Sequence, residues 1–279
     1  MKIPSRIAGA EGPPLEQTLD ARWIMAYSAG IGETDARCYD TTQGEALPVH
    51  PVFPVCYEWQ PLQPVRDLAE LKPVSPRLVH AQHDIAIHRP LRAGETVRTS
   101  ARLIAALARA PGAFLVLRCE TRDARGDKVV TSDYGYLYRG VALEGADARV
   151  AEVADPSPFD GTLEPLGDIA VPATAAHVYT ECARIFNPIH TDIAYARAAG
   201  LPGIILHGTA TLALSVSRAL RAHDIDWRRV RGVSCRFSGM VLMPSLLSVR
   251  SARHADALGF EAANDRGDKV ISRGRLLLE

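Results

Sequence analysis

The chain has 279 residues, and its 32 lysines and arginines balance 32 aspartates and glutamates, so the formal net charge at pH 7 is zero. No block of like charge stands out, which argues against nucleic acid or an anionic membrane as partner. The N-terminal residues lack an apolar core of signal-peptide length, and no segment approaches the roughly 20 apolar residues that cross a bilayer. A soluble, cytoplasmic protein with one large domain or two ordinary ones is expected.

The cysteines are widely spaced and odd in number, and they form neither a disulfide framework nor a metal-binding CxxC pair. They are Cys38, Cys56, Cys119, Cys182 and Cys235. We expect reduced thiols at these positions. Cys182 carries no feature of an activated nucleophile, so a small buried thiol is the expected state there.

The first helical signal follows Asp20, a plausible N-cap before the apolar residues Trp23, Ile24 and Tyr27. The next candidate, residues 50–65, reads HPVFPVCYEWQPLQPV and is too rich in proline for a long helix.

His80, His83 and His88 then lie on one extended run. Odd and even positions of a strand point to opposite faces, so we do not expect these histidines to converge on a metal ion.

The chain repeats itself. Residues 124–130 read ARGDKVV and residues 265–271 read DRGDKVI, and each follows an alternating run typical of a half-buried strand. Gly126 and Gly267 supply the positive φ that a tight hairpin needs. Two copies of one sheet-forming unit are predicted, over residues 1–140 and 169–279. The linker between them, residues 141–168, is rich in Gly, Pro, Ala and acids.

The second copy has the better helix. HGTATLALSVSRALRAH, residues 207–223, places Leu212, Val216, Ala219 and Leu220 on one apolar stripe. This helix should be buried against a sheet.

Just before it, residues 183–192 read ARIFNPIHTD. Asn187 can cap a helical turn, and the helix that follows should stop at Gly200. His190 near a helix start is expected to stay neutral and able to act as a base, while the N–H of Gly208 could bind an incoming oxygen. A structural or surface histidine is the plain alternative. His207 could be catalytic or could hold a turn, and no G-x-S-x-G motif signals a serine nucleophile.

Residues 179–220 resemble the hydratase motif of the MaoC-like, R-specific enoyl thioester hydratases and 3-hydroxyacyl dehydratases. The resemblance rests on NPIHTD, the A-x-x-A-G-L-P after it and the I-x-H-G helix entry, and segments such as HRPLRAGETV extend it to essentially the whole chain. It implies an α+β double hot-dog: two copies of a curved antiparallel sheet, each wrapped around a helix. The N-terminal copy would lack the motif and the C-terminal copy would be catalytic.

By this resemblance His190 is half of a catalytic dyad, Asn187 orients the site, and the N–H of Gly208 polarises the thioester carbonyl. The family's dyad also needs an aspartate five residues before the histidine, and that position is Ile185. His190 then works alone, or another carboxylate such as Glu181 reaches in. We expect His207 and Ile185 to contact substrate.

In the first copy, GIGETDARCY at residues 30–39 looks like a worn version of the motif, with Glu33 and Cys38 in place of the acid and the histidine. No chemistry is expected there. Phe53 and Trp59 would line an apolar tunnel for the acyl chain beside a shortened central helix, or would simply fill the core.

The leading hypothesis is a hydro-lyase of fatty acid metabolism that interconverts enoyl and 3-hydroxyacyl thioesters of CoA or an acyl carrier protein. No metal or nicotinamide cofactor is implied. The alternatives are an acyl-thioester-binding protein without turnover and a hot-dog thioesterase. The thioesterase would want a carboxylate on the central helix, and the residues after His207 supply none. A homodimer through edge strands is plausible.

Overall fold

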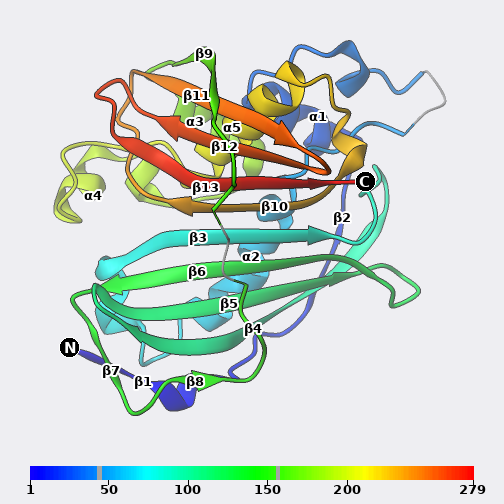
Figure 1. Cartoon of the computed structure of the whole chain (residues 1–279). Helices are drawn as coiled ribbons and strands as arrows, with labels where there is room; N and C mark the ends of the chain where they lie inside the picture. Colours follow the sequence, from blue (N-terminus) through cyan, green and yellow to red (C-terminus); the bar gives the residue numbers. More distant parts are fainter. Residues whose placement is uncertain (43–45, 155–157) are drawn as a thin grey trace.

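A long antiparallel sheet runs through the whole molecule (Figure 1). The computed structural model describes residues 1–42, 46–154 and 158–279. The main strands, in the order in which they lie side by side, are β2 (Leu15–Thr18), β4 (Thr96–Arg109), β5 (Gly112–Arg122), β6 (Lys128–Arg139), β3 (Leu78–Ile87), β10 (Val230–Phe237), β13 (Lys269–Leu278), β12 (Ala257–Ala263), β11 (Ser245–His254) and β9 (Glu164–Val171). The short strand β8 (Ala148–Arg149) pairs with β4, and β1 (Lys2–Pro4) pairs in parallel with β7 (Ala142–Glu144).

The predicted internal repeat is visible in the strand order. Outward from the centre the first half runs β3, β6, β5, β4, and the second half runs β10, β13, β12, β11, which is the same order in equivalent strands. The halves join through antiparallel pairing of β3 with β10, where Ile85 lies opposite Val233. Gly126 and Gly267 adopt φ of 87° and 81° in the two equivalent hairpin turns, as their sequence predicts.

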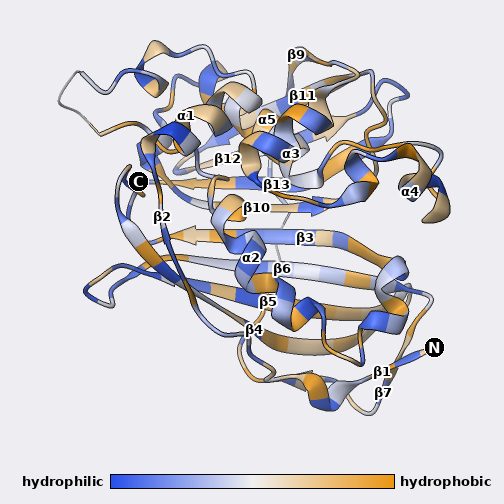
Figure 2. Ribbon diagram, turned by 180° about the vertical axis from the view of Figure 1, so that it is seen from behind, coloured by the Kyte–Doolittle hydropathy of each residue, from blue (hydrophilic) through white to orange (hydrophobic). Residues whose placement is uncertain are grey.

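The helices cover one face of this sheet (Figure 2). They are α1 (Ala21–Gly30), α2 (Pro54–Arg66), α3 (Ala175–Ala183), α4 (Ile193–Ala198) and α5 (Gly208–Ala222). The predicted cap of α1 is confirmed, since the Asp20 side chain accepts a hydrogen bond from the N–H of Trp23 at 2.8 Å. Among the described residues, no helix is both long and apolar enough to cross a membrane.

Helix α5 packs its predicted apolar stripe against the second half of the sheet. Leu212, Val216, Ala219 and Leu220 are all fully buried. They belong to a core cluster that also contains Phe53 from the first half, so a continuous hydrophobic core joins the halves.

The expectation that prolines would shorten the first central helix is wrong. Helix α2 runs for 13 residues with Pro61 and Pro64 inside it. A proline lacks the N–H that would bond the carbonyl four residues earlier. For Pro61 that carbonyl belongs to Tyr57, and Nε2 of Gln17 donates to it instead at 2.6 Å. A distant side chain therefore replaces the missing bond, and α2 fills the space that a short helix would leave.

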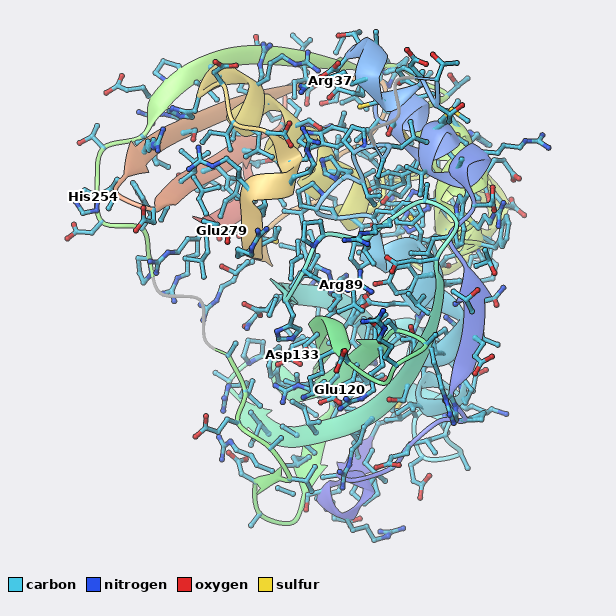
Figure 3. The ribbon with its side chains drawn as sticks, turned by 90° about the vertical axis from the view of Figure 1, so that its right-hand side faces the viewer. Arg37, Arg89, Glu120, Asp133, His254 and Glu279 are labelled. Carbon is cyan, nitrogen blue, oxygen red and sulfur yellow. The ribbon has the colours of Figure 1, made fainter. Side chains whose placement is uncertain are left out.

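The linker segment crosses the face of the first half that lies opposite the helices (Figure 1). Its Ala151 and Val153 pack beside the buried Val116. Arg118 forms a 2.7 Å ion pair with Asp133 and also donates to the carbonyl of Glu152 in the linker (Figure 3). The linker thus covers an outer sheet surface, and β9 already begins at its end, at Glu164.

Candidate active site

His190 is held by a short, well-capped turn between α3 and α4. Helix α3 ends at Arg184, which adopts φ of 57°, and the chain then leads to a single 3-10 turn, Pro188–His190. The Asn187 side chain caps that turn by accepting from the N–H of Ile189 at 3.4 Å. Asp192 caps α4, which ends before Gly200 as the sequence predicts. These local bonds fix where the histidine side chain points.

The orientation of the His190 ring defines its chemistry. Its Nδ1 lies 2.8 Å from the carbonyl oxygen of Ile205, and a carbonyl only accepts, so Nδ1 carries the proton. Nε2 is then the nitrogen with a free lone pair. Burial lowers the pKa of His190 to about 4, and the hydrogen bond to Ile205 partly opposes this. The imidazole is therefore neutral near pH 7. The main cause of this neutral form is burial and not the helix end.

His207 is the direct neighbour of the His190 ring. The two imidazole rings are stacked, and their centroids lie 3.6 Å apart. Nε2 of His207 lies 3.2 Å from the Thr180 hydroxyl, while its Nδ1 is buried without a hydrogen-bond partner among the described residues. Burial, and after it the neighbouring His190, lower the pKa of His207 well below its usual value. A charged imidazole is disfavoured at both positions.

Gly208 begins α5 directly beside this pair. The first N–H groups of a helix have no partner inside the helix, and the helix dipole makes them attractive to negative charge. A Cβ at position 208 would lie 3.2 Å from the Phe237 ring, which is closer than most real contacts of this kind. Glycine is therefore the residue that fits against the Phe237 ring at the start of α5.

The position of the family's aspartate holds a buried, apolar side chain. Ile185 is only 6% exposed. Glu181, considered as a substitute, has an exposed side chain on α3. No carboxylate of the described residues forms a hydrogen bond or ion pair with His190 or His207. The described residues around His190 and His207 therefore include a neutral imidazole and the start of α5, and no carboxylate bonded to either ring.

Residues 30–39, the degenerate copy of the motif in the first half, make structural contacts. Glu33 forms a 2.7 Å ion pair with Arg221 of α5. Cys38 is buried, and burial raises the pKa of its thiol to about 12. Phe53 is fully buried and packs edge-on against Trp23, in the core. Trp59 is partly buried and lies 4.8 Å from the guanidinium carbon of Arg66.

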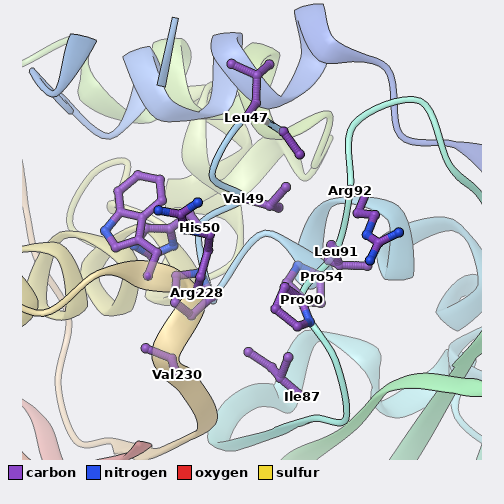
Figure 4. Close-up of a pocket in the computed structure, with 13 residues that line it drawn as sticks. Leu47, Val49, His50, Pro54, Ile87, Pro90, Leu91, Arg92, Arg228 and Val230 are labelled. Atoms are coloured by element: carbon purple, nitrogen blue, oxygen red, sulfur yellow. The ribbon is translucent and has the colours of Figure 1, made fainter. Parts of the chain in front are cut away.

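A cavity of about 230 Å³ lies where the two halves meet, near the start of α2 and the start of β10 (Figure 4). Its walls are mainly apolar and include Leu47, Pro54, Leu91 and Val230. His50 on its wall is fully engaged, since Nδ1 accepts from the N–H of Val52 and Nε2 faces the Ser217 hydroxyl. In the internal repeat this cavity takes the place that the His190 site has at the start of α5.

The argument that His80 and His83 point to opposite faces is wrong. The pairing of β3 with β6 shifts register between His80 and Gln82, and a bulge of this kind reverses the alternation. The two rings are therefore 5.2 Å apart. His88 instead faces the Thr131 hydroxyl at the surface. No group of three metal-binding side chains occurs in the parts of the chain that the structure describes.

Sequence reasoning missed a set of buried polar groups between α2 and the sheet. Both carboxyl oxygens of Glu58 accept hydrogen bonds, from the hydroxyls of Ser132 and Tyr134, at 2.7 and 2.6 Å. Arg66, one turn beyond Gln63 on the same helix, is partly buried, and its Nε and Nη1 atoms have no hydrogen-bond partner in the part of the chain that the structure describes. The available signal was the presence of Glu58 and Arg66 in a segment otherwise rich in apolar residues and proline.

Comparison with known proteins agrees with this architecture. Residues 168–273 match the family described as MaoC like domain, and residues 6–132 match the FAS1-like, dehydratase domain region. A MaoC-like dehydratase from Phytophthora capsici superposes with a TM-score of 0.82 at 19% identity, over 97% of this chain and 96% of that one. The peroxisomal multifunctional enzyme type 2 of Drosophila melanogaster superposes with a TM-score of 0.78 at 21% identity, over 96% of this chain and 48% of that one.

A fatty acid synthase subunit beta of Aspergillus oryzae is 42% identical over 80 residues, which are 28% of this chain and 4% of that one. The alignments with the curated relatives span between 4% and 47% of those proteins' length. At these identities the solved structures establish the fold, and the predicted α+β double hot-dog is confirmed.

Proposed function

The chain joins a FAS1-like dehydratase region to a MaoC like domain and so belongs to the MaoC-like dehydratases, and on this premise we propose that it is a hydro-lyase acting on acyl thioesters. The reaction interconverts a 2-enoyl thioester and water with a 3-hydroxyacyl thioester. The observation that carries the proposal is the buried, neutral His190, whose proton sits on Nδ1 against the Ile205 carbonyl. That arrangement leaves a free lone pair on Nε2, and the His190 ring stacks on His207, the residue directly before Gly208.

The chemistry follows from these groups. Nε2 of His190 accepts a proton from water while the water oxygen bonds to the β carbon of the enoyl group. The electrons move to the thioester oxygen, where the N–H of Gly208 and the positive end of α5 stabilise the developing charge. The imidazolium then returns the proton to the α carbon. One water is consumed, and no acid other than His190 is required.

The surroundings of His190 favour the second proton transfer of this cycle, from the imidazolium to the α carbon. A protonated His190 would be buried against the ring of His207, which makes the imidazolium a strong acid. It therefore gives its proton up readily to the enolate-like intermediate. The missing aspartate leaves the water less well positioned, so we expect turnover to be slower by about a hundred- to ten-thousandfold than with a complete dyad.

A binding protein without turnover is the second candidate, and the apolar Ile185 in the aspartate position favours it. The thioesterase alternative has less support, because the described first turn of α5 holds no carboxylate.

The decisive experiment follows the loss of 2-enoyl absorbance when the purified protein is mixed with 2-enoyl-CoA thioesters, together with a reagent for free thiol. We expect absorbance to fall without release of thiol, and His190→Ala to abolish the change. His254→Ala, on an exposed strand end, is the matched control and should retain full activity (Figure 3). Release of thiol would indicate a thioesterase. Binding of acyl-CoA without any loss of absorbance would indicate a binding protein.

A further inference from the structure

Arg66, the last residue of α2, is a cation that has no counter-ion among the described residues. Its guanidinium carbon lies 4.8 Å from the centre of the Trp59 ring and 5.5 Å from that of Tyr136. Its Nε and Nη1 atoms are buried and have no acceptor, and it forms no ion pair with any described residue. A guanidinium stays charged at every accessible pH, so buried N–H groups of this kind are suited to an anion that is not part of the chain.

Two histidines, His80 and His83, belong to the same group of buried polar side chains as Arg66. The register shift in β3 brings His80 and His83 together, and the His80 ring lies 5.2 Å from that of Tyr136. Nε2 of His80 and both ring nitrogens of His83 are buried without a hydrogen-bond partner among the described residues. His83 is completely buried. Buried polar groups are nearly always hydrogen-bonded, so these atoms are available to a polar group from outside the chain.

This polar surface begins next to the position proposed for the thioester. The Phe237 ring lies 4.6 Å from that of His80. It also lies 3.2 Å from the point where a Cβ on Gly208 would be. Phe237 therefore contacts both the start of α5 and His80 of this cluster.

The shape of the first half limits how long the acyl group can be. Because α2 is a complete helix, Leu62 and Val65 pack fully buried in the core of the first half and leave no space there for an alkyl chain. Glu58 also lies between α2 and the sheet. Its carboxyl group accepts hydrogen bonds from the hydroxyls of Ser132 and Tyr134. An alkyl chain would leave the buried N–H groups of Arg66 unpaired, whereas a carboxylate would supply an acceptor for them.

We infer that the substrate is a short acyl thioester whose far end is a carboxylate, bound by Arg66 with His80 and His83 beside it. This inference rests on the proposed function and names the substrate class of the same site. Arg66 acts in it as a residue that determines specificity, and it takes no part in the proton transfers.

Turnover of matched substrates tests the inference. Glutaconyl-CoA carries a carboxylate at the end of its 2-enoyl group, and 2-hexenoyl-CoA is a methyl-ended thioester of similar length. We expect kcat/KM to be at least about tenfold higher for glutaconyl-CoA. Arg66→Gln should lower that value about ten- to a hundredfold, as expected for the loss of a hydrogen bond to a charged group, and should change 2-hexenoyl-CoA less than about threefold. Arg98→Gln, at an exposed strand position, is the control and should alter neither.

The outcomes separate this inference from the proposed function. A higher kcat/KM for 2-hexenoyl-CoA in the wild type, or an equal loss of kcat/KM on both substrates in Arg66→Gln, would refute the inference of a carboxylate-ended substrate. Neither result would affect the proposal of a hydro-lyase. If neither substrate is turned over, the hydro-lyase proposal fails, and calorimetric binding of glutaryl-CoA against hexanoyl-CoA decides the inference. Tighter binding of glutaryl-CoA that is lost in Arg66→Gln and weakened less in Arg66→Lys supports it, and equal affinity refutes it.

Discussion

Glu58 makes the stability of the fold depend on pH in a direction that can be measured. Its side chain is completely buried between α2 and the sheet. Burial raises its pKa from 4.5 to about 7, although the hydrogen bonds from Tyr134 and Ser132 oppose the shift. Between these two values the folded protein holds a proton that the unfolded chain releases. The free energy of unfolding should therefore fall as pH rises from about 4.5 to about 7, and stay constant above that.

The interval between the two pKa values corresponds to about 3 kcal/mol. In Glu58→Gln the amide keeps the shape and can still bond both hydroxyls, but it does not titrate. The variant should match the wild type near pH 4.5 and be more stable by up to about 3 kcal/mol at pH 8, which is a rise in Tm of roughly 5–10 °C. Urea unfolding at both pH values measures the difference, with the exposed Glu16→Gln as control. A difference that does not change with pH would refute the reasoning.

Three further results are expected. The neutral form of His190 is the proposed base, and its pKa is lowered to about 4, so kcat/KM should stay level from pH 8 to about 5 and fall only below that. A fall in kcat/KM centred near pH 6.5 would contradict the buried environment. Gly208→Ala should lower kcat/KM about ten- to a hundredfold, since its methyl group would lie 3.2 Å from the Phe237 ring and displace the start of α5 together with the N–H. Unchanged activity would exclude that N–H as the donor. Gln17→Ala should destabilise the protein by about 1–3 kcal/mol in urea unfolding, because it leaves the Tyr57 carbonyl without its partner, and an unchanged unfolding midpoint would show that α2 does not need this bond.

Features set by neighbouring residues were predictable from the sequence. The hairpin glycines Gly126 and Gly267, the Asp20 cap and the apolar stripe of α5 all depend on short-range patterns, and the structure confirms each of them. The repeat of the ARGDKVV turn was enough to predict two equivalent sheets, which the strand order confirms.

Features that depend on distant partners were not predictable. In α2 the Tyr57 carbonyl that Pro61 leaves unpaired is bonded by the Gln17 amide, which lies 40 residues from Tyr57 in the sequence. The approach of His80 to His83 depends on a register shift against β6 that no local pattern signals. For the same reason the sequence suggested a neutral His190 but attributed it to a helix end, whereas its burial comes from the packing of the folded chain.

The central claim is that His190 adds water to an enoyl thioester without help from an aspartate. Incubation of a 2-enoyl-CoA with the protein in water enriched in oxygen-18 tests it directly by mass spectrometry of the product. The account predicts a 3-hydroxyacyl-CoA that carries the label on its hydroxyl group with the wild-type protein, and no such product with His190→Ala. Labelled product at the same rate from both proteins, or from neither, would contradict it.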